Sequence, residues 1–143
     1  MDPSKTKIIN FFKFSEFDCK GGCETCKLQG SSGRVNMDSD FLKRLDHARA
    51  IVKGKTPFVI TSGYRCEAHN TKIGGRKKGP NSKGSSHMYG FAADIAATSS
   101  TDRFNITQAL IEAGFDRIGI SAKGGFIHVD SDPDKSKHVL FLY

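Results

Sequence analysis

Two histidines and an aspartate are the residues of this chain best suited to hold a metal ion. His87 precedes Asp94 by seven residues, and Gly90 lies between them. Because glycine carries no Cβ, it allows a turn that brings both side chains to one ion. His128 lies in the segment 126–130, which reads as a strand. Two histidines and one carboxylate form the ligand set of an open catalytic zinc site, with water in the fourth position.

Alternation along that strand indicates which side chains share a face. Successive side chains point to opposite sides of a sheet, so Ile127 and Val129 lie on one face and His128 and Asp130 on the other. We expect the aliphatic pair to face the helices and the polar pair to face a cleft. A histidine on a strand is more often a hydrogen-bonded core residue than a ligand, so the spacing alone leaves both interpretations open.

Three helical patterns precede or separate the strands that must position these residues. The first begins at the N-cap Asp38 and ends at Gly54. A short helix is expected over 67–73, and a third helix is expected with Ser100 or Thr101 as its N-cap. In the third helix we expect these side chains to face inward: Phe104, Leu110, Ile111 and Ala113.

The strand patterns are short and concentrated late in the chain. Helices grouped early and a hairpin run late indicate an α+β fold with a mainly antiparallel sheet and helices packed on one side. We expect one domain over residues 1–143, in which 1–36 form an N-terminal arm with a cysteine cluster. The strands are expected over 57–61, 92–96, 117–121, 126–130 and 138–143.

Composition narrows the class of protein. The chain has 143 residues, a formal charge of +7 and four cysteines. No apolar run reaches the ~18 residues of a membrane helix. The first residues lack the apolar region of a signal peptide, so we expect synthesis in the cytoplasm without such a signal. Five cations between 68 and 93 face no acid in that window, which indicates either a solvated loop or a basic rim for an anionic substrate: Lys72, Arg76, Lys77, Lys78 and Lys83.

Several segments together resemble the D-Ala-D-Ala carboxypeptidase family. Ser85-x-His87-x-x-Gly90-x-Ala92-x-Asp94 resembles its first zinc motif. Members are zinc peptidases that cut peptide bonds involving D-amino acids in peptidoglycan. They include carboxypeptidases, dipeptidases and phage endolysins.

The resemblance covers nearly the whole chain. The segment 61–65, followed by His69-Asn70, looks like the Ser-Gly-Tyr-Arg segment of the family, and 126–130 is similar to the segment with the last zinc histidine. Phe14-Ser15-Glu16-Phe17 with Cys19 resembles the arm of the small single-domain members.

The resemblance implies a zinc cleft and a role for each matching residue. It places zinc on His87, Asp94 and His128, and it implies that Arg65 binds the scissile carbonyl or its oxyanion. Many members carry an acid three residues before the last zinc histidine as general base, where this chain has Gly125. Asp130 is our candidate for a base or for a partner that orients a ligand; its alternative is a cap for the following turn. His69 is a further candidate proton carrier.

These observations predict a zinc metallopeptidase that hydrolyses peptidoglycan stem peptides, as a carboxypeptidase or as an endopeptidase. We expect a monomer whose substrate lies in the cell wall or periplasm, with the compact form of a phage enzyme. A zinc-containing domain that binds peptidoglycan without cutting it is the alternative. A basic nucleic-acid-binding protein is a third interpretation, which the metal and Arg65 motifs disfavour; neither nucleic acid nor membrane is expected as a partner.

The cysteines leave three alternatives open. Cys19, Cys23 and Cys26 form a tight cluster, and Cys66 lies far away in sequence beside Arg65. They form free or partly paired thiols, two disulfides, or a second zinc site, although only one C-x2-C pair is present where zinc sites usually have two. Cys66 is positioned to tie the N-terminal arm to the edge of the active site.

Overall fold

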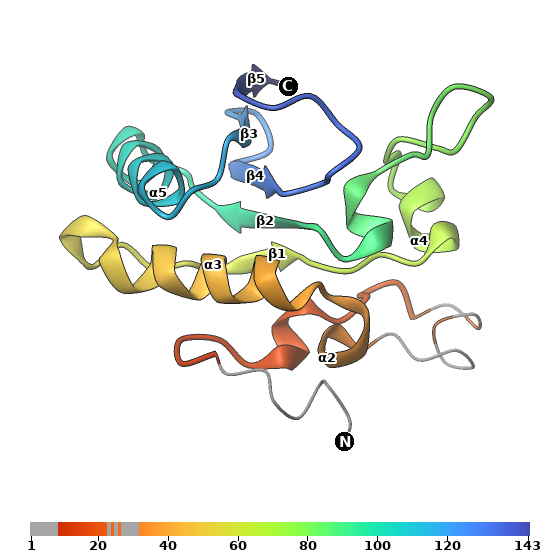
Figure 1. Cartoon of the computed structure of the whole chain (residues 1–143), viewed down its shortest axis with the longest axis horizontal. Coiled ribbons are helices and arrows are strands. Elements are labelled where there is room, and N and C mark those ends of the chain that lie inside the picture. The colour runs from red at the N-terminus through yellow and green to blue at the C-terminus, as the bar shows by residue number, and fades with distance from the viewer. Residues whose placement is uncertain (1–8, 23, 25, 27–31) are drawn as a thin grey trace.

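The fold is described from a computed structural model that covers residues 9–22, 24, 26 and 32–143. Short helical turns (η) and α-helices alternate with strands in the first two thirds of the chain, and three strands close it (Figure 1). The elements are η2 (Phe14–Phe17), α2 (Gly33–Asn36), α3 (Ser39–Ile51), η3 (Lys53–Lys55), β1 (Ile60–Ser62), α4 (Glu67–Lys72), η4 (Ser86–Tyr89), β2 (Ala92–Ala96), α5 (Ser100–Glu112), β3 (Arg117–Ser121), β4 (Phe126–Asp130) and β5 (Val139–Leu142).

The five strands form one sheet in the order β1-β2-β4-β3-β5. Three of the four pairings are antiparallel, and β3 and β4 form the expected hairpin. The exception is β5, which runs parallel to β3 at the edge of the sheet. The α+β prediction with a mainly antiparallel sheet is therefore confirmed.

One face of the sheet carries the hydrophobic core. Ile127 and Val129 of β4 are fully buried there, as the alternation predicts. They join the buried faces of α3 and α5, which pack against each other. The opposite face of β2 and β4 is left for polar side chains.

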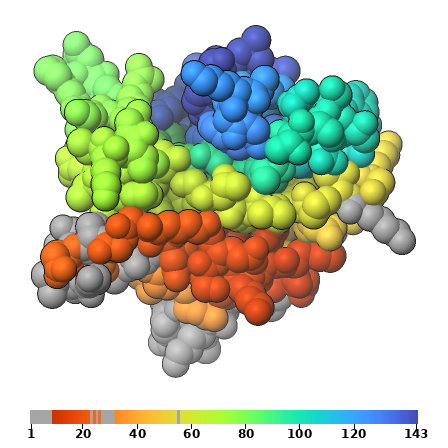
Figure 2. Space-filling view, turned by 180° about the vertical axis from the view of Figure 1, so that it is seen from behind, coloured from red at the N-terminus to blue at the C-terminus, as the bar shows by residue number. Residues whose placement is uncertain are grey.

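The N-terminal arm packs along β1 and the turn that follows it. Phe17 is completely buried in the core, and its carbonyl accepts a hydrogen bond of 2.9 Å from the amide of Tyr64. Phe12 is also buried and meets Phe17 edge to face. Figure 2 shows the arm, in red and orange, lying against the yellow and green layer that follows α3. The arm is thus an integral part of the fold.

The first long helix matches its sequence signals at the start and ends earlier than expected. The Asp38 carboxylate caps α3 by accepting from the amide of Phe41. The helix ends at Ile51, and Gly54 adopts a left-handed conformation with φ of 71° in η3. Glycine tolerates this conformation at no steric cost.

The inward face predicted for the third helix is partly wrong. Ser99 caps α5, one residue before the predicted cap at Ser100 or Thr101. Leu110 is buried as expected, but Phe104 and Ile111 are 67% and 57% exposed. A helix turns by 100° per residue, so residues seven apart share a stripe. The buried stripe instead contains Ile106, Ala109 and Leu110.

The strand ends also differ from the predictions. β1 runs from Ile60 to Ser62 instead of over 57–61, and its pairing with β2 shifts register between these two residues. β5 begins after His138, whose φ of 59° cannot continue a strand. The partner of β1 is β2 and the partner of β5 is β3, and the local sequence of β1 or β5 reveals neither partner. No helix within the described ranges has the length and apolar character needed to span a bilayer.

The cations of the 68–93 segment are less isolated than the local sequence indicates. Lys83 lies 2.6 Å from Asp132 and 2.9 Å from Asp134, both of which come from the distant segment after β4. Lys78 lies 3.3 Å from Glu67 at the surface. The expectation of five unopposed charges is therefore wrong for these two lysines, and one of them fastens the loop to the rest of the fold.

Candidate metal centre

One row of paired residues crosses the sheet and carries two of the three predicted ligands. Asp94 of β2 lies directly opposite His128 of β4, and Ser62 of β1 lies on its other side. Residues paired in this way project from the same face. His128 Nδ1 consequently lies 3.0 Å from Asp94 Oδ1.

The third predicted ligand comes from η4, the turn just before β2. His87 Nε2 lies 3.2 Å from the same Asp94 oxygen. Gly90 ends η4 in a left-handed conformation with φ of 78°, and a Cβ there would collide with the carbonyl of Asn36. The glycine thus permits the close turn that brings His87 back over Asp94.

The three donor atoms converge from buried side chains. Nitrogen atoms of His87 and His128 and an oxygen of Asp94 all lie within 4.8 Å of one another. His87 is 2% exposed, and Asp94 and His128 are also buried. The structure therefore brings together at one point the three residues that the resemblance implies as ligands.

Each imidazole has a partner that leaves the inward nitrogen free to bind a cation. His87 Nδ1 donates to the carbonyl of Gly63 at 2.8 Å, so the lone pair is on Nε2. His128 Nε2 donates to Asp130 Oδ2 at 2.7 Å, which leaves the lone pair on Nδ1. Such outer partners fix the orientation and raise the basicity of metal-binding histidines. The donor set fits a divalent zinc-type cation.

The titration of these groups also indicates a site built for a cation. Burial lowers the pKa of His87 and keeps its ring neutral. Burial acts in the same direction on His128, but the hydrogen bonds with Asp130 and Asp94 outweigh it and raise its pKa. The carboxylates of Asp94 and Asp130 can only accept hydrogen bonds. Without a metal, His128 must therefore carry a proton on each ring nitrogen to donate to both of them. A cation at Nδ1 replaces the second proton.

Asp130 is buried and has both carboxylate oxygens engaged. Oδ2 accepts from His128, while Oδ1 accepts from Arg117 Nε at 2.7 Å and from the amide of Asp132 at 3.2 Å. Burial would raise the pKa of Asp130, but the contacts with His128 and Arg117 hold it below its usual value. The geometry shows Asp130 both orienting His128 and capping the turn that follows β4.

Arg65 lies against the far oxygen of Asp94. Its Nη2 donates to Asp94 Oδ2 at 3.0 Å, and its Nε donates to Ser62 Oγ at 2.9 Å. Nη1 lies 3.4 Å from Asn70 Oδ1, and the backbone amide donates to the carbonyl of His87. A guanidinium has five N–H donors, and three of them are used in these contacts. Two remain that can point at a substrate oxygen.

A hollow of about 480 Å³ lies over the metal group. Arg65, Arg76 and Arg117 give its lining a positive character, and the rings of Phe141 and Tyr143 form an aromatic edge. His69 and Gly125 are not part of this lining. Gly125 lies in the turn before β4 with φ of 66°, so no side chain is supplied at the position three residues before His128.

Two residues of the site were missed by the sequence reasoning. Arg117 is the first residue of β3. Ser121 pairs with Phe126 and Ile118 pairs with Val129, so continuing this register along the predicted hairpin would have placed Arg117 opposite Asp130. Asn70 is fully buried and links Arg65 to the loop by donating to the carbonyl of Arg76 at 2.9 Å. The family-like segment includes Asn70 but assigns it no role, because its contacts join parts of the chain that local patterns do not connect.

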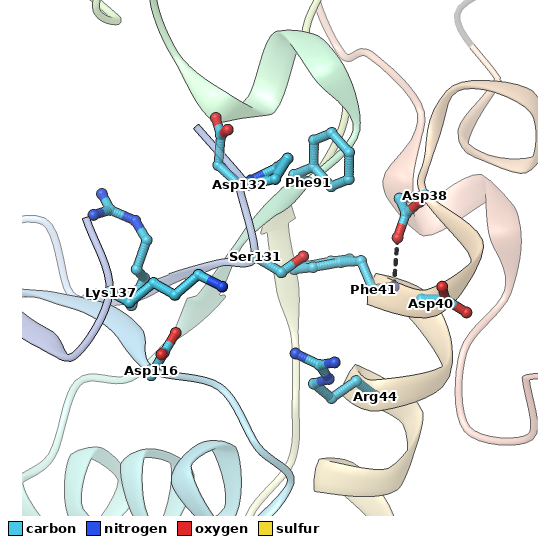
Figure 3. Close-up of a pocket in the computed structure, with 11 residues that line it drawn as sticks. Asp38, Asp40, Phe41, Arg44, Phe91, Asp116, Ser131, Asp132 and Lys137 are labelled. Atoms are coloured by element: carbon cyan, nitrogen blue, oxygen red, sulfur yellow. Dashed lines mark hydrogen bonds between the residues drawn. The ribbon is translucent and has the colours of Figure 1, made fainter. Parts of the chain in front are cut away.

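A second hollow, of about 320 Å³, lies beside α3 (Figure 3). Charged side chains of both signs line it, among them Asp38, Arg44 and Lys137. Among the described residues its lining contains no histidine or cysteine, and two lining residues, Arg117 and Asp132, contact the His128 partner Asp130. The metal-binding chemistry therefore belongs to the first hollow.

Comparison with known proteins agrees with this geometry. No curated protein and no solved structure matches the chain. A model of the family described as Peptidase M15 matches residues 11–130, which include η2, the metal group and Asp130. The chain therefore belongs to the Peptidase M15 family, the D-Ala-D-Ala carboxypeptidase family, and this membership implies a metallopeptidase that acts on peptidoglycan-type peptides.

Proposed function

We propose that this chain is a zinc-dependent hydrolase of peptide bonds in the stem peptides of peptidoglycan. The observation that carries the proposal is the convergence of His87 Nε2, Asp94 Oδ1 and His128 Nδ1 beneath a hollow that Arg65 also lines. A cation held by three protein ligands keeps a position open for water or substrate, as catalytic zinc sites do. The cell wall or periplasm is the place of action that this substrate requires.

The roles of the residues follow from their contacts. A zinc ion bound there would supply a water of lowered pKa and would polarise the scissile carbonyl. The two remaining N–H donors of Arg65 bind the carbonyl oxygen and stabilise the charge that develops on it. Asp130 holds the Nε2 proton of His128 and so keeps Nδ1 directed at the cation.

The rim of the hollow favours an anionic peptide. Arg76, Arg117 and Lys135 lie around it, whereas the two acids among its described lining residues, Asp94 and Asp130, are each engaged by an arginine. Stem peptides carry carboxylates, which a positive rim attracts. Partial loss of solvation, together with the nearby Asp94 carboxylate, raises the pKa of Tyr143 to about 12, so its phenol stays a hydrogen-bond donor at neutral pH.

The second candidate function is a zinc-containing domain that binds peptidoglycan without cutting it. Gly125 supplies no general base, and both oxygens of Asp130 are already engaged. Bound zinc lowers the pKa of its water toward 7, so hydrolysis does not strictly need a strong base. This is why we place the hydrolase first.

Incubation with purified sacculi separates the two functions. The hydrolase releases new amine termini over time from zinc-loaded protein, and a His87→Ala variant releases none. His138→Ala is the matched control, because that histidine is largely exposed and remote from the metal group. Co-sedimentation with sacculi without any release of amines would overturn the hydrolase and support the binding domain.

A further inference from the structure

Three cysteines from distant parts of the chain meet in a second buried group. Cys19 and Cys26 belong to the N-terminal arm, and Cys66 immediately precedes α4. They are only 5–8% exposed, and their sulfur atoms all lie within 4.8 Å of one another. Apart from Tyr64, which packs against them, they form a cluster separate from the main core.

Backbone amides point at two of these sulfurs. The amide of Cys66 donates to Cys19 Sγ at 3.4 Å, and the amide of His69 donates to Cys66 Sγ at 3.3 Å. Both sulfurs act as acceptors in these contacts, and each keeps further lone pairs for a cation. Thiolates are the form in which cysteine binds metals.

The spacing of the sulfurs suits a shared cation better than a disulfide. Cys19 Sγ and Cys26 Sγ are 3.2 Å apart, well beyond the bond length of about 2.05 Å in a disulfide. In a tetrahedral zinc site with Zn–S bonds of about 2.3 Å, the sulfurs are separated by about 3.8 Å. Hydrophobic packing alone does not explain why three sulfurs from two segments lie as close together as the ligands of one zinc ion.

We propose that Cys19, Cys26 and Cys66 bind one soft divalent cation of the zinc class at a site distinct from the His87 group. Each thiol loses its proton to solvent as its sulfur binds the ion. The three sulfurs supply three of the four ligands that structural zinc sites usually have. Cys23 lies outside the described residues, and the proposal does not depend on it.

This second ion fastens the arm to the segment that carries Arg65. Tyr64 donates to the carbonyl of Phe17, and Arg65 donates through its backbone to His87. Cys66 directly follows Arg65 in the chain, so a metal that links Cys66 to Cys19 and Cys26 also restrains the backbone of Arg65. The ion has a structural role, so the inference stands whether or not the chain hydrolyses peptides.

Metal content of a double variant provides the first test. His87→Ala/His128→Ala removes two of the three ligands of the candidate catalytic site and leaves the cysteines intact. We expect about two equivalents of zinc in the parent chain, prepared under reducing conditions, and about one in the double variant. Loading that variant with Co²⁺ should produce the intense thiolate-to-metal charge-transfer absorption of a sulfur-ligated ion. Less than a tenth of an equivalent of metal and no such absorption would overturn the proposal.

A measurement on the unmodified chain guards against variants that do not fold. Alkylation of individual cysteines is mapped by mass spectrometry with and without a strong chelator. The metal protects Cys19, Cys26 and Cys66 together, so all three should become reactive together when the chelator is added. If they stay unreactive in denaturant until a reductant is added, they form disulfides and the proposal is wrong.

Discussion

His128 and Asp130 lie two residues apart on β4, and their side chains meet at 2.7 Å between Nε2 and Oδ2. Strand geometry causes this contact, because alternate residues share a face. The same alternation buries Ile127 and Val129 on the other side. One five-residue strand therefore supplies part of the core, one candidate metal ligand and the carboxylate that orients it.

Replacing Asp130 by Asn should weaken metal binding. The substitution removes the charge that raises the basicity of His128, and loss of such a partner costs about 10- to 100-fold in metal affinity. Competition with a chromophoric chelator measures the change. Asp134→Asn is the matched control, since Asp134 is 70% exposed on its side chain and does not contact His128. Equal affinities for parent and Asp130→Asn would show that the contact does not tune the site.

Replacing Arg65 by Lys should lower turnover and leave zinc bound. Lysine keeps the charge but loses the planar fork that contacts Asp94 and Ser62 and that we propose to contact the substrate. Loss of one oxyanion donor typically reduces kcat by about 10²–10³-fold. Single-turnover assays on a stem peptide, run beside zinc analysis, check both points. Arg103→Lys on the outer side of α5 serves as the control. Unchanged kcat in Arg65→Lys would remove Arg65 from the reaction.

Gly63→Ala should destabilise the fold and the metal group together. A Cβ on Gly63 would lie 2.6–2.9 Å from the backbone and Cβ of Phe17, and the Gly63 carbonyl is the partner of His87 Nδ1. Overpacking of this kind costs about 1–3 kcal/mol of unfolding free energy. Urea unfolding measures it. Gly79→Ala is the control, because a Cβ there meets no atom within 4 Å. Equal stability of the two variants would contradict the close packing of the arm.

Asp132 should contribute stability that disappears in acid. It lies 2.6 Å from Lys83 and accepts from Ser86 at 2.7 Å. Burial would raise its pKa, but the bonds from Lys83 and Ser86 lower it. A lowered folded-state pKa means that the stabilisation is present above the unfolded pKa of about 3.9 and is lost as the pH falls through the folded value.

The measurement is the difference in unfolding free energy between the parent chain and Asp132→Asn as a function of pH. At pH 6 we expect a loss of about 1.5–3 kcal/mol, and we expect the gap to narrow below pH 4. Asp134→Asn, the exposed partner of Lys83, should cost less than about 1 kcal/mol. If the stability difference between the parent chain and Asp132→Asn grows as the pH falls, the pKa of Asp132 is not lowered by folding and the prediction is wrong.

Local patterns predicted the parts of the fold that depend on one segment. The bounds of β2, β3 and β4 match the predictions, and the cap at Asp38 is confirmed. For the metal group, the spacing left two interpretations open, and the family resemblance singled out His87, Asp94 and His128; their meeting depends on the pairing of β2 with β4, which one segment does not reveal.

Features that depend on contact between distant segments were not predictable in this way. The edge position of β5, the shift of register in β1 and the pairing of Lys83 with Asp132 are set by partners far away in the sequence. The same holds for Asn70, whose contacts with Arg65 and Arg76 exist only after the loop has folded back. Phe104 and Ile111 were misplaced because their helix has apolar residues on more than one side.

Mass spectrometry of purified muropeptides tests the central claim most directly. The chain is first freed of metal by a chelator, and one portion is then reloaded with zinc. We predict that the zinc-loaded chain converts muropeptides into fragments that have gained one water at a peptide bond. The metal-free chain and a zinc-treated His87→Ala variant should leave the muropeptides intact. Intact muropeptides after incubation with the zinc-loaded chain, or equal cleavage by His87→Ala, would contradict the account.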